Sequence, residues 1–293
     1  GLGGSGRGQA PVIPKLLNAD WNYWPEGHSA DAIWASSAKL GFDGIELGVY
    51  DVADQLSDEK VAEYVRLTDV HGLAVGTVLY SMPPSKWPDG GLGDPRQASL
   101  AIEGALATAR VGRDAFGCKV LGLWPGADTL DRHTRPAEVW PVMVESFRAI
   151  ADGVADLGME VAVEYKPLEM LANADAALRL CDAVDHPALG VLLDTGHALW
   201  VGEDLPVALH LIGDRLKHVH LGDTPGPIEA DLPPGWHHDF TAFMAAIDQI
   251  GYAGAMSLDM YGGVDEGVVG SEEASAYGYT TMKEAAARAR GQR

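Results

Sequence analysis

Short apolar runs rich in β-branched residues alternate along this chain with longer stretches whose apolar positions recur at helical spacing. Such runs are typical of buried strands in a parallel sheet, and the longer stretches are typical of amphipathic helices. Eight runs occur, and a helical stretch follows each one. The predicted strands span residues 12–17, 44–49, 73–80, 119–124, 160–165, 190–194, 217–221 and 255–259.

The helical stretches carry recognisable start signals. Ser29, Ser57 and Asn173 precede three of them as N-caps do, and several stretches end in glycine. Eight strands each followed by a helix predict an α/β protein of one domain, a (β/α)8 TIM barrel over residues 12–293. A doubly wound sheet is the lesser alternative. The glycine-rich residues 1–11 are predicted to form a flexible or vector-derived tail.

Acidic and imidazole side chains stand at the ends of four successive predicted strands: Glu164, Asp194, His220 and Asp259. In a TIM barrel, the carboxyl ends of the strands converge on one mouth, where the chemistry takes place. Three carboxylates and an imidazole at one point need a divalent cation. The sequence therefore predicts a metal site. The ligand set suits Mn²⁺ best, and Mg²⁺, Co²⁺ or Zn²⁺ would also fit.

A second group, His197, Glu229 and Asp231, lies close by in the sequence. If the loop that carries the two acids folds back over the mouth, these residues could hold a second cation. Two alternatives stay open. The acids could belong to a solvated loop, and His197 could instead orient Asp194 or contact the substrate.

Lys166 shares a strand face with Glu164 because side chains alternate along a strand, so both are expected in the mouth. A lysine there can stabilise a substrate oxygen that gains negative charge. Trp24 and Trp124, near the ends of the first and fourth strands, are candidate walls for the C–H face of a sugar. Glu46 is interpreted as structural.

Composition narrows the range of partners. A formal charge of −21, with no basic stripe to offset it, disfavours nucleic acid and anionic membranes. No apolar run approaches the roughly 18 residues that a membrane span needs, which favours a cytoplasmic protein. Cys118 and Cys181 lack metal-type spacing and are expected to be buried thiols. A homo-oligomer is expected only from the frequency of such assemblies among enzymes.

The ExKP segment at 164–167, the DTGH turn at 194–197 and the HVHLGD segment at 218–223 resemble the xylose-isomerase-like TIM-barrel superfamily. The resemblance covers essentially the whole chain and comes nearest to the L-rhamnose isomerase type. It implies that Glu164, Asp194, His220 and Asp259 bind the first metal. It further implies that Lys166 contacts the carbonyl end of the substrate, and that His197, Glu229 and Asp231 match the second metal, although the family usually has Asp at the position of Glu229.

Other branches of this superfamily fit the sequence less well. Ketose 3-epimerases use two glutamates as acid and base, whereas this chain has the shorter Asp259 at the second position. The apurinic-site endonucleases need further histidines after the third and fourth strands, and this chain has no histidine at the ends of those two strands.

These features lead to a hypothesis for the function: a divalent-metal-dependent isomerase that interconverts the aldose and ketose forms of an unphosphorylated sugar. In that mechanism, Asp231 orients a base on the second metal; without that metal, Glu164 or Asp259 acts as the base. The alternative is a sugar 3-epimerase, dehydratase or lyase that removes a proton next to a ketone, with an inosose or 3-oxo-glycoside as substrate. A non-catalytic sugar-binding barrel is the third hypothesis.

Overall fold

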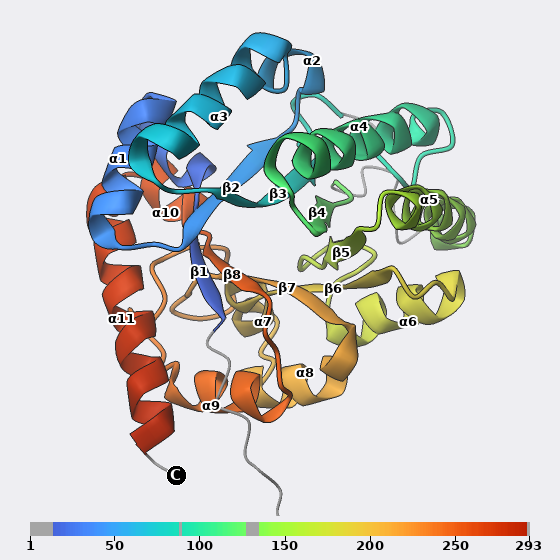
Figure 1. Cartoon of the computed structure of the whole chain (residues 1–293). Coiled ribbons are helices and arrows are strands. Elements are labelled where there is room, and N and C mark those ends of the chain that lie inside the picture. The colour runs from blue at the N-terminus through green and yellow to red at the C-terminus, as the bar shows by residue number, and fades with distance from the viewer. Residues whose placement is uncertain (1–13, 88–89, 127–134, 292–293) are drawn as a thin grey trace, which may run out of the picture.

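The computed structural model describes residues 14–87, 90–126 and 135–291, and its centre is a closed barrel of eight parallel strands (Figure 1). Strands that are consecutive in the sequence are neighbours in the sheet, and β1 pairs with β8 to close it. The strands are β1 Lys15–Ala19, β2 Gly44–Val49, β3 Val75–Ser81, β4 Val120–Trp124, β5 Glu160–Glu164, β6 Leu189–Asp194, β7 Leu216–Leu221 and β8 Ala255–Leu258.

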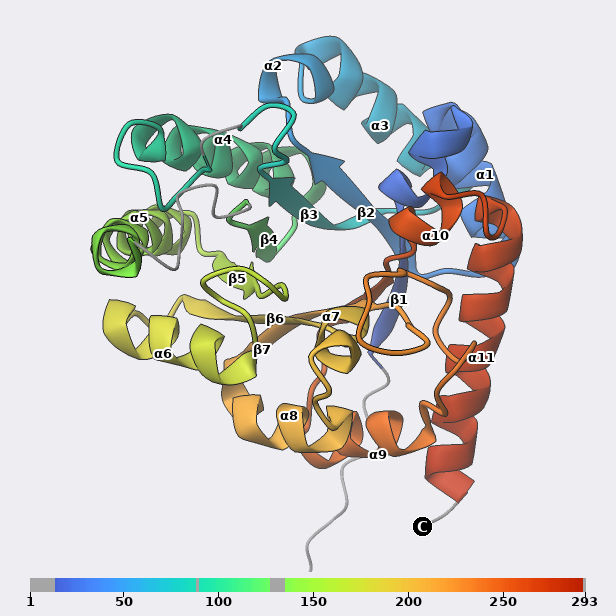
Figure 2. The ribbon, with the colours of Figure 1, turned by 180° about the vertical axis from the view of Figure 1, so that it is seen from behind.

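Helices form the outer ring around the strands (Figures 1 and 2). Ser29, Ser57 and Asn173 each accept a hydrogen bond from a backbone N–H of the helix that follows, which confirms them as N-caps. The helices of the ring are α1 Ala30–Leu40, α3 Asp58–His71, α4 Ala98–Phe116, α5 Pro136–Asp156, α6 Ala174–Val184, α8 Leu205–Ile212, α9 Thr241–Gln249 and α11 Ser271–Gly291.

Three shorter helices follow strands at the carboxyl-terminal end of the barrel. The 3-10 helix η1 (Asp20–Glu26) follows β1 directly, α7 (Thr195–Trp200) follows β6, and α10 (Tyr261–Asp265) follows β8. In Figure 2 the orange loop between β7 and α9 lies beside α10 at this end of the barrel. The short helices α2 (Val52–Gln55) and η2 (Gly213–Arg215) complete the set within the described residues.

The predicted (β/α)8 barrel is confirmed, and all predicted strand ends but one fall within two residues of the observed ones. The prediction for β1 differs at the start, because Pro14 is not part of the strand, which begins at Lys15; residues 12 and 13 lie outside the described residues. It was also two residues short at the other end, since β1 continues through Asn18 to Ala19. Asn18 is buried in the strand, and its amide donates hydrogen bonds to Tyr23, Ser37 and Ser275.

Apolar side chains fill the space between strands and helices, and both Cys118 and Cys181 are buried free thiols as expected. The inside of the barrel is different. It holds a small apolar cluster and, beside it, the buried charged group of Glu46, His218 and His220. The apolar cluster consists of Ala19, Trp21, Leu79, Ala162 and Leu192.

Within the described part of the chain, no helix is both long enough and apolar enough to cross a bilayer. The predicted tail, residues 1–11, lies outside the described residues.

Candidate active site

Glu164, Asp194, His220 and Asp259 converge at one end of the barrel, as their positions at the ends of β5, β6, β7 and β8 predict. One ligand atom from each side chain lies within 4.8 Å of the others. Glu164, Asp194 and His220 are buried, and the side chain of Asp259 is 18% exposed. The cluster therefore faces the pocket from the barrel floor.

The imidazole of His220 is the centre of this group. Its Nδ1 lies 3.1 Å from Oε1 of Glu164 and 3.2 Å from Oδ2 of Asp259, with Oδ2 of Asp194 at 3.9 Å. All three acids thus turn an oxygen toward the same nitrogen. A cation between these atoms would meet oxygen and nitrogen donors from four different strands.

The local structure fixes the direction of two of the acids. Asp194 is the N-cap of α7, and its Oδ1 accepts a hydrogen bond from the backbone N–H of His197 at 3.0 Å. Asp259 accepts a hydrogen bond at Oδ1 from the indole Nε1 of Trp21, at 2.8 Å. Because Oδ1 of each carboxylate is held in this way, Oδ2 faces the centre of the cluster.

The buried acids and histidines of this cluster have shifted pKa values. Burial, with the nearby Asp259 and Glu164 carboxylates, raises the pKa of Asp194 to about 6, although His197 opposes this shift. Burial alone would lower the pKa of His220, but the carboxylates of Glu46 and Glu164 raise it well above its usual value. The acids thus compete for positive charge, and a divalent cation would supply it. The donor set fits such an ion.

His197, Glu229 and Asp231 also come together, with one ligand atom of each within 4.8 Å of the others. The loop after β7 folds back because Asp223 and Leu232 exchange two backbone hydrogen bonds as a small antiparallel bridge. Burial raises the pKa of Asp231 to about 7, and the Asp259 carboxylate adds to this shift. The folded loop that the sequence hypothesis requires is therefore present.

Two members of this second group also have protein partners. Glu229 forms an ion pair with Lys166, and burial of the lysine, which would lower its pKa, is outweighed by Glu229, so the pKa is raised. His197 donates from Nδ1 to the backbone carbonyl of Tyr165 at 3.0 Å, which leaves Nε2 as the free ring nitrogen. The side chains of the second group are thus less available to bind a cation than those of the first group.

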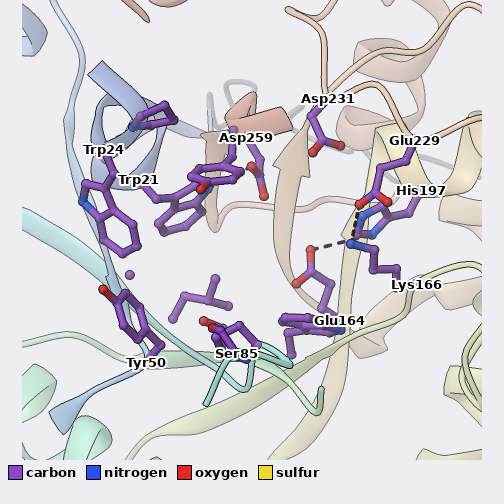
Figure 3. A pocket seen from close by; sticks show the side chains of 17 residues that line it. Trp21, Trp24, Tyr50, Ser85, Glu164, Lys166, His197, Glu229, Asp231 and Asp259 are labelled. Carbon is purple, nitrogen blue, oxygen red and sulfur yellow. Dashed lines mark hydrogen bonds and ion pairs between the residues drawn. The ribbon is translucent and has the colours of Figure 1, made fainter. Parts of the chain in front are cut away.

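A cavity of about 580 Å³ opens above both groups (Figure 3). In Figure 3 Asp231, Glu229, His197 and Lys166 lie to one side and Trp24 and Tyr50 to the other, with Trp21 and Asp259 next to each other between them. Trp24 and Trp124 both line this cavity, as the sequence predicts. The lining residues are Trp21, Trp24, Pro25, Gly48, Tyr50, Leu79, Ser81, Pro83, Ser85, Trp124, Glu164, Lys166, His197, Glu229, Asp231, Asp259 and Tyr261.

Sequence reasoning missed several of these residues. Trp21, Tyr50 and Tyr261 each follow a strand end, so their position was the available signal, but without a charge they looked like ordinary packing residues. Glu46 was interpreted as structural, although a lone acid in the apolar segment IELGV was itself a signal. It hydrogen-bonds to His218 directly beneath the cluster.

A family model described as "Xylose isomerase-like TIM barrel" matches residues 34–284. The chain belongs to this family. The predicted superfamily is therefore confirmed, while the narrower resemblance to the L-rhamnose isomerase type stays a prediction.

Individual proteins resemble the chain over different lengths. The L-ribulose 3-epimerase of Methylomonas sp. is 26% identical over 249 residues, which cover 81% of this chain and 80% of that protein. The inosose dehydratase of Geobacillus kaustophilus is 32% identical over 84 residues, so the match spans only 29% of this chain and 27% of that protein. The crystal structure of IOLI protein with a bound zinc atom has a TM-score of 0.75 at 16% identity, and covers 94% of this chain and 98% of its own.

The relatives include a sugar epimerase and an inosose dehydratase, which agrees with the predicted class, a sugar isomerase or epimerase with a dehydratase as an alternative. The roles assigned to individual residues, the identity of the metal, the oligomeric state and the cytoplasmic location stay predictions.

Proposed function

We propose that this protein is a divalent-cation-dependent isomerase or epimerase that transfers a proton at the carbon next to the carbonyl of an unphosphorylated sugar. The observation that carries the proposal is the meeting of Glu164 and Asp259 at Nδ1 of His220, at 3.1 and 3.2 Å, on the floor of the cavity. Two carboxylates fixed at one cation position can serve as ligands and also move protons of a bound substrate.

The cation would be held by Glu164, Asp194, His220 and Asp259. When bound, it supplies a positive charge that lowers the pKa of a substrate hydroxyl and polarises the adjacent carbonyl. The mixed oxygen and nitrogen donors suit Mn²⁺, with Mg²⁺, Co²⁺ and Zn²⁺ as alternatives.

Glu164 and Asp259 are the candidate bases. Both carboxylates line the cavity, so a substrate bound at the cation position has two acids within reach. Removal of the proton next to the carbonyl gives an enediolate, and return of a proton to a different carbon or face gives the isomer or epimer. The pKa of Asp231, raised by burial to about 7, makes it a further candidate for exchanging protons with the substrate hydroxyls.

Lys166 is the candidate for stabilising the oxygen that gains negative charge. Its Nζ lies 5.2 Å from the centre of the Trp124 ring, so its position is supported from two directions, by the indole and by Glu229. Among the described residues that line the cavity, Lys166 alone carries a fixed positive charge, and Glu229 already neutralises it. A phosphate group would therefore meet mostly acids here, which supports an unphosphorylated substrate.

The wall of Trp21, Trp24 and Tyr50 supports a substrate with a C–H face. The Trp24 and Tyr50 rings meet edge to face, with centroids 5.6 Å apart. Aromatic rings of this kind present apolar surface to the carbon skeleton, while the acids opposite them bind hydroxyls. Such a two-sided cavity is suited to a sugar or polyol.

Deuterium exchange tests this proposal. The Mn²⁺-loaded protein is incubated in D₂O with a panel of free ketoses, inososes and 3-oxo-glycosides, and products are followed by NMR. We expect at least one substrate to turn over and to take up solvent deuterium at the carbon next to the carbonyl. Glu164→Gln and Lys166→Met should lower that turnover by about 100-fold or more. Turnover without exchange would contradict proton transfer, and full activity in both variants would contradict the assigned site.

A second candidate is the two-cation aldose–ketose isomerase, in which hydrogen passes between neighbouring carbons without exchange. The grouping of His197, Glu229 and Asp231 favours it, since these residues could hold a second ion if Glu229 left Lys166. Two tightly bound Mn²⁺ ions per chain together with retained substrate label would favour this candidate over the first.

A further inference from the structure

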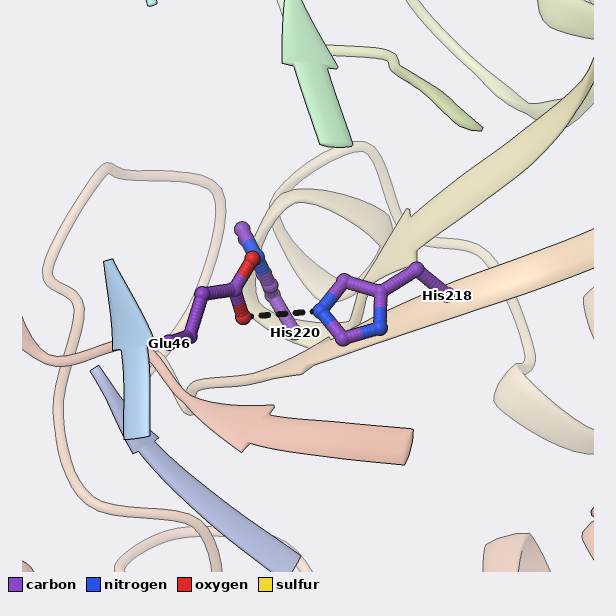
Figure 4. A group of neighbouring side chains, drawn as sticks. All are labelled: Glu46, His218 and His220. Carbon is purple, nitrogen blue, oxygen red and sulfur yellow. Dashed lines mark hydrogen bonds and ion pairs between the residues drawn. The ribbon is translucent and has the colours of Figure 1, made fainter. Parts of the chain in front are cut away.

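Glu46 is completely buried inside the barrel, below the proposed cation position, and its two carboxylate oxygens face two different histidines (Figure 4). His218 donates from Nε2 to Oε2 at 2.8 Å. On the other side, Nε2 of His220 lies 3.5 Å from Oε1. The three side chains come from β2 and β7, which are separated in the barrel by β1 and β8, so their contact depends on the closure of the barrel.

A buried carboxylate is costly unless it is paired with a cation or with hydrogen-bond donors. The interior of a TIM barrel is normally filled by branched apolar side chains, so Glu46 is an exception. Instead, each carboxylate oxygen of Glu46 is paired with an imidazole, one of His218 and one of His220. A polar group held in this way inside the barrel needs a reason beyond packing.

The geometry of His220 gives that reason. Its Nδ1 faces the acids Glu164 and Asp259, and its Nε2 faces Glu46. A neutral histidine can bind a cation through Nδ1 only if the proton is on Nε2. A carboxylate beside Nε2 favours that tautomer and also makes Nδ1 a stronger donor.

We infer that Glu46 is a positioning residue that holds the Nε2–H tautomer of His220 and so prepares Nδ1 to bind the catalytic cation. This inference rests on the proposed function, because it assumes a cation at Glu164, Asp194, His220 and Asp259. His218 serves the same arrangement one step further away, since its hydrogen bond holds the carboxylate of Glu46 in place.

The same three residues, Glu46, His218 and His220, could in principle form a cation site of their own, since one atom of each lies within 4.8 Å of the others. The short hydrogen bond between Glu46 and His218 favours the positioning role, because a cation would replace that proton. Metal stoichiometry separates the two arrangements. A site within this trio would lose its own ion when Glu46 is changed, whereas a positioning residue would weaken an ion that stays bound.

The test compares Glu46→Gln with Glu160→Gln, a matched control. Glu160 also forms an ion pair within the sheet, with Lys217 at 2.7 Å, but at the opposite end of β5 from the cavity. MnCl₂ is titrated into the metal-free proteins by calorimetry, and the Kd and number of ions are measured. We expect one tight ion per chain in all three proteins, with a Kd about 10- to 100-fold higher in Glu46→Gln and unchanged in Glu160→Gln.

A second measurement reads the Nε2–H group of His220 directly. In Zn²⁺-bound protein with ¹⁵N-labelled histidine, long-range ¹H–¹⁵N spectra should assign the proton of His220 to Nε2. In the wild type this proton should resonate further downfield than in Zn²⁺-bound Glu46→Gln, because a carboxylate accepts a stronger hydrogen bond than an amide oxygen. If Glu46→Gln does not fold, Glu46→Asp carries the test, because it keeps the charge but withdraws it from His220 by one methylene. The Mn²⁺ Kd of Glu46→Asp should lie between the wild-type value and a value 100-fold higher.

The outcomes are distinct. An unchanged Mn²⁺ affinity in Glu46→Gln, an unchanged shift of the His220 Nε2–H proton, or the loss of one of two ions would overturn the positioning role while leaving the proposed function intact. A wild-type protein that binds no divalent cation would instead overturn the proposed function.

Discussion

The indole Nε1 of Trp21 donates a hydrogen bond to Oδ1 of Asp259 at 2.8 Å, and this contact joins the end of β1 to the end of β8 across the closure of the barrel. The ring of Trp21 also packs against the imidazole of His220, with the two ring centroids 5.6 Å apart. One side chain therefore orients an acid of the proposed cation site and forms part of the cavity wall.

Trp21→Phe keeps the aromatic ring and removes the hydrogen bond. We expect Asp259 to lose its fixed direction and the Mn²⁺ Kd to rise by about 10-fold, because partners of metal ligands commonly contribute that much to affinity. Trp124→Phe is the matched control, since its indole also lines the cavity but donates to Glu169. Calorimetry on both variants makes the comparison, and equal affinities would argue against the orienting role of Trp21.

Lys166→Met removes the positive charge and retains a side chain of similar length. Because Lys166 is the candidate that stabilises negative charge on the substrate oxygen, kcat should fall by about 100- to 1000-fold with a smaller change in KM. The free Glu229 would then face Asp231 and His197 without its partner, so Mn²⁺ should bind additionally at this second group. Steady-state kinetics and Mn²⁺ stoichiometry measure the two effects. A Lys166→Met protein with wild-type kcat would remove the lysine from the mechanism.

Asp20 provides a prediction about stability and pH. Burial raises its pKa to about 8, although the backbone N–H of Gly48 donates to Oδ1 at 2.9 Å and opposes the shift. The folded state therefore keeps a proton that the unfolded chain releases near pH 4. The contribution of Asp20 to the free energy of unfolding must then decrease as the pH rises from about 4 to about 8, by at most about 1.4 kcal/mol per pH unit, and stay constant above that range.

Asp20→Asn mimics the protonated form and should abolish this dependence. We expect the variant to be more stable than the wild type at pH 8, with a difference that shrinks steadily toward pH 4. Urea unfolding of both proteins between pH 5 and pH 8 measures it. A difference that stays constant across this range would show that Asp20 does not hold a proton in the folded state.

Gly48 lets two tryptophans approach the second strand. A Cβ at this position would lie 2.7 Å from Cε3 of Trp21 and 3.0 Å from Cη2 of Trp24. Gly48→Ala should therefore displace the aromatic wall, lower the free energy of unfolding by about 1–3 kcal/mol and raise KM. Gly226→Ala is the control, since a Cβ there would meet nothing within 4 Å. Thermal unfolding measures the stability of both variants, and steady-state kinetics measures their KM. Equal stability and equal KM in the two variants would contradict this expectation.

The barrel could be predicted because its pattern is repeated eight times, so an error at one strand end does not change the topology. The first cation group could be predicted for the same reason. Glu164, Asp194, His220 and Asp259 come from consecutive strands, and the carboxyl ends of parallel strands must converge.

Contacts between distant strands could not be predicted in this way. Glu46 and His218 are 172 residues apart in the sequence, and only the closure of the barrel brings them within 2.8 Å. Trp21 and Asp259 are likewise 238 residues apart. Neither pair leaves a local pattern, because the spacing of residues along one strand carries no information about the partner across the barrel.

The central claim is a single divalent cation among Glu164, Asp194, His220 and Asp259, and a crystal grown with MnCl₂ tests it most directly. The measurement is the anomalous difference map recorded at the manganese absorption edge. We predict a peak bonded to Nδ1 of His220 and to an oxygen of each of the three acids, and no such peak in crystals of Asp194→Asn treated with a chelator. A map without density among these four side chains, at a Mn²⁺ concentration that saturates the protein in solution, would contradict the claim.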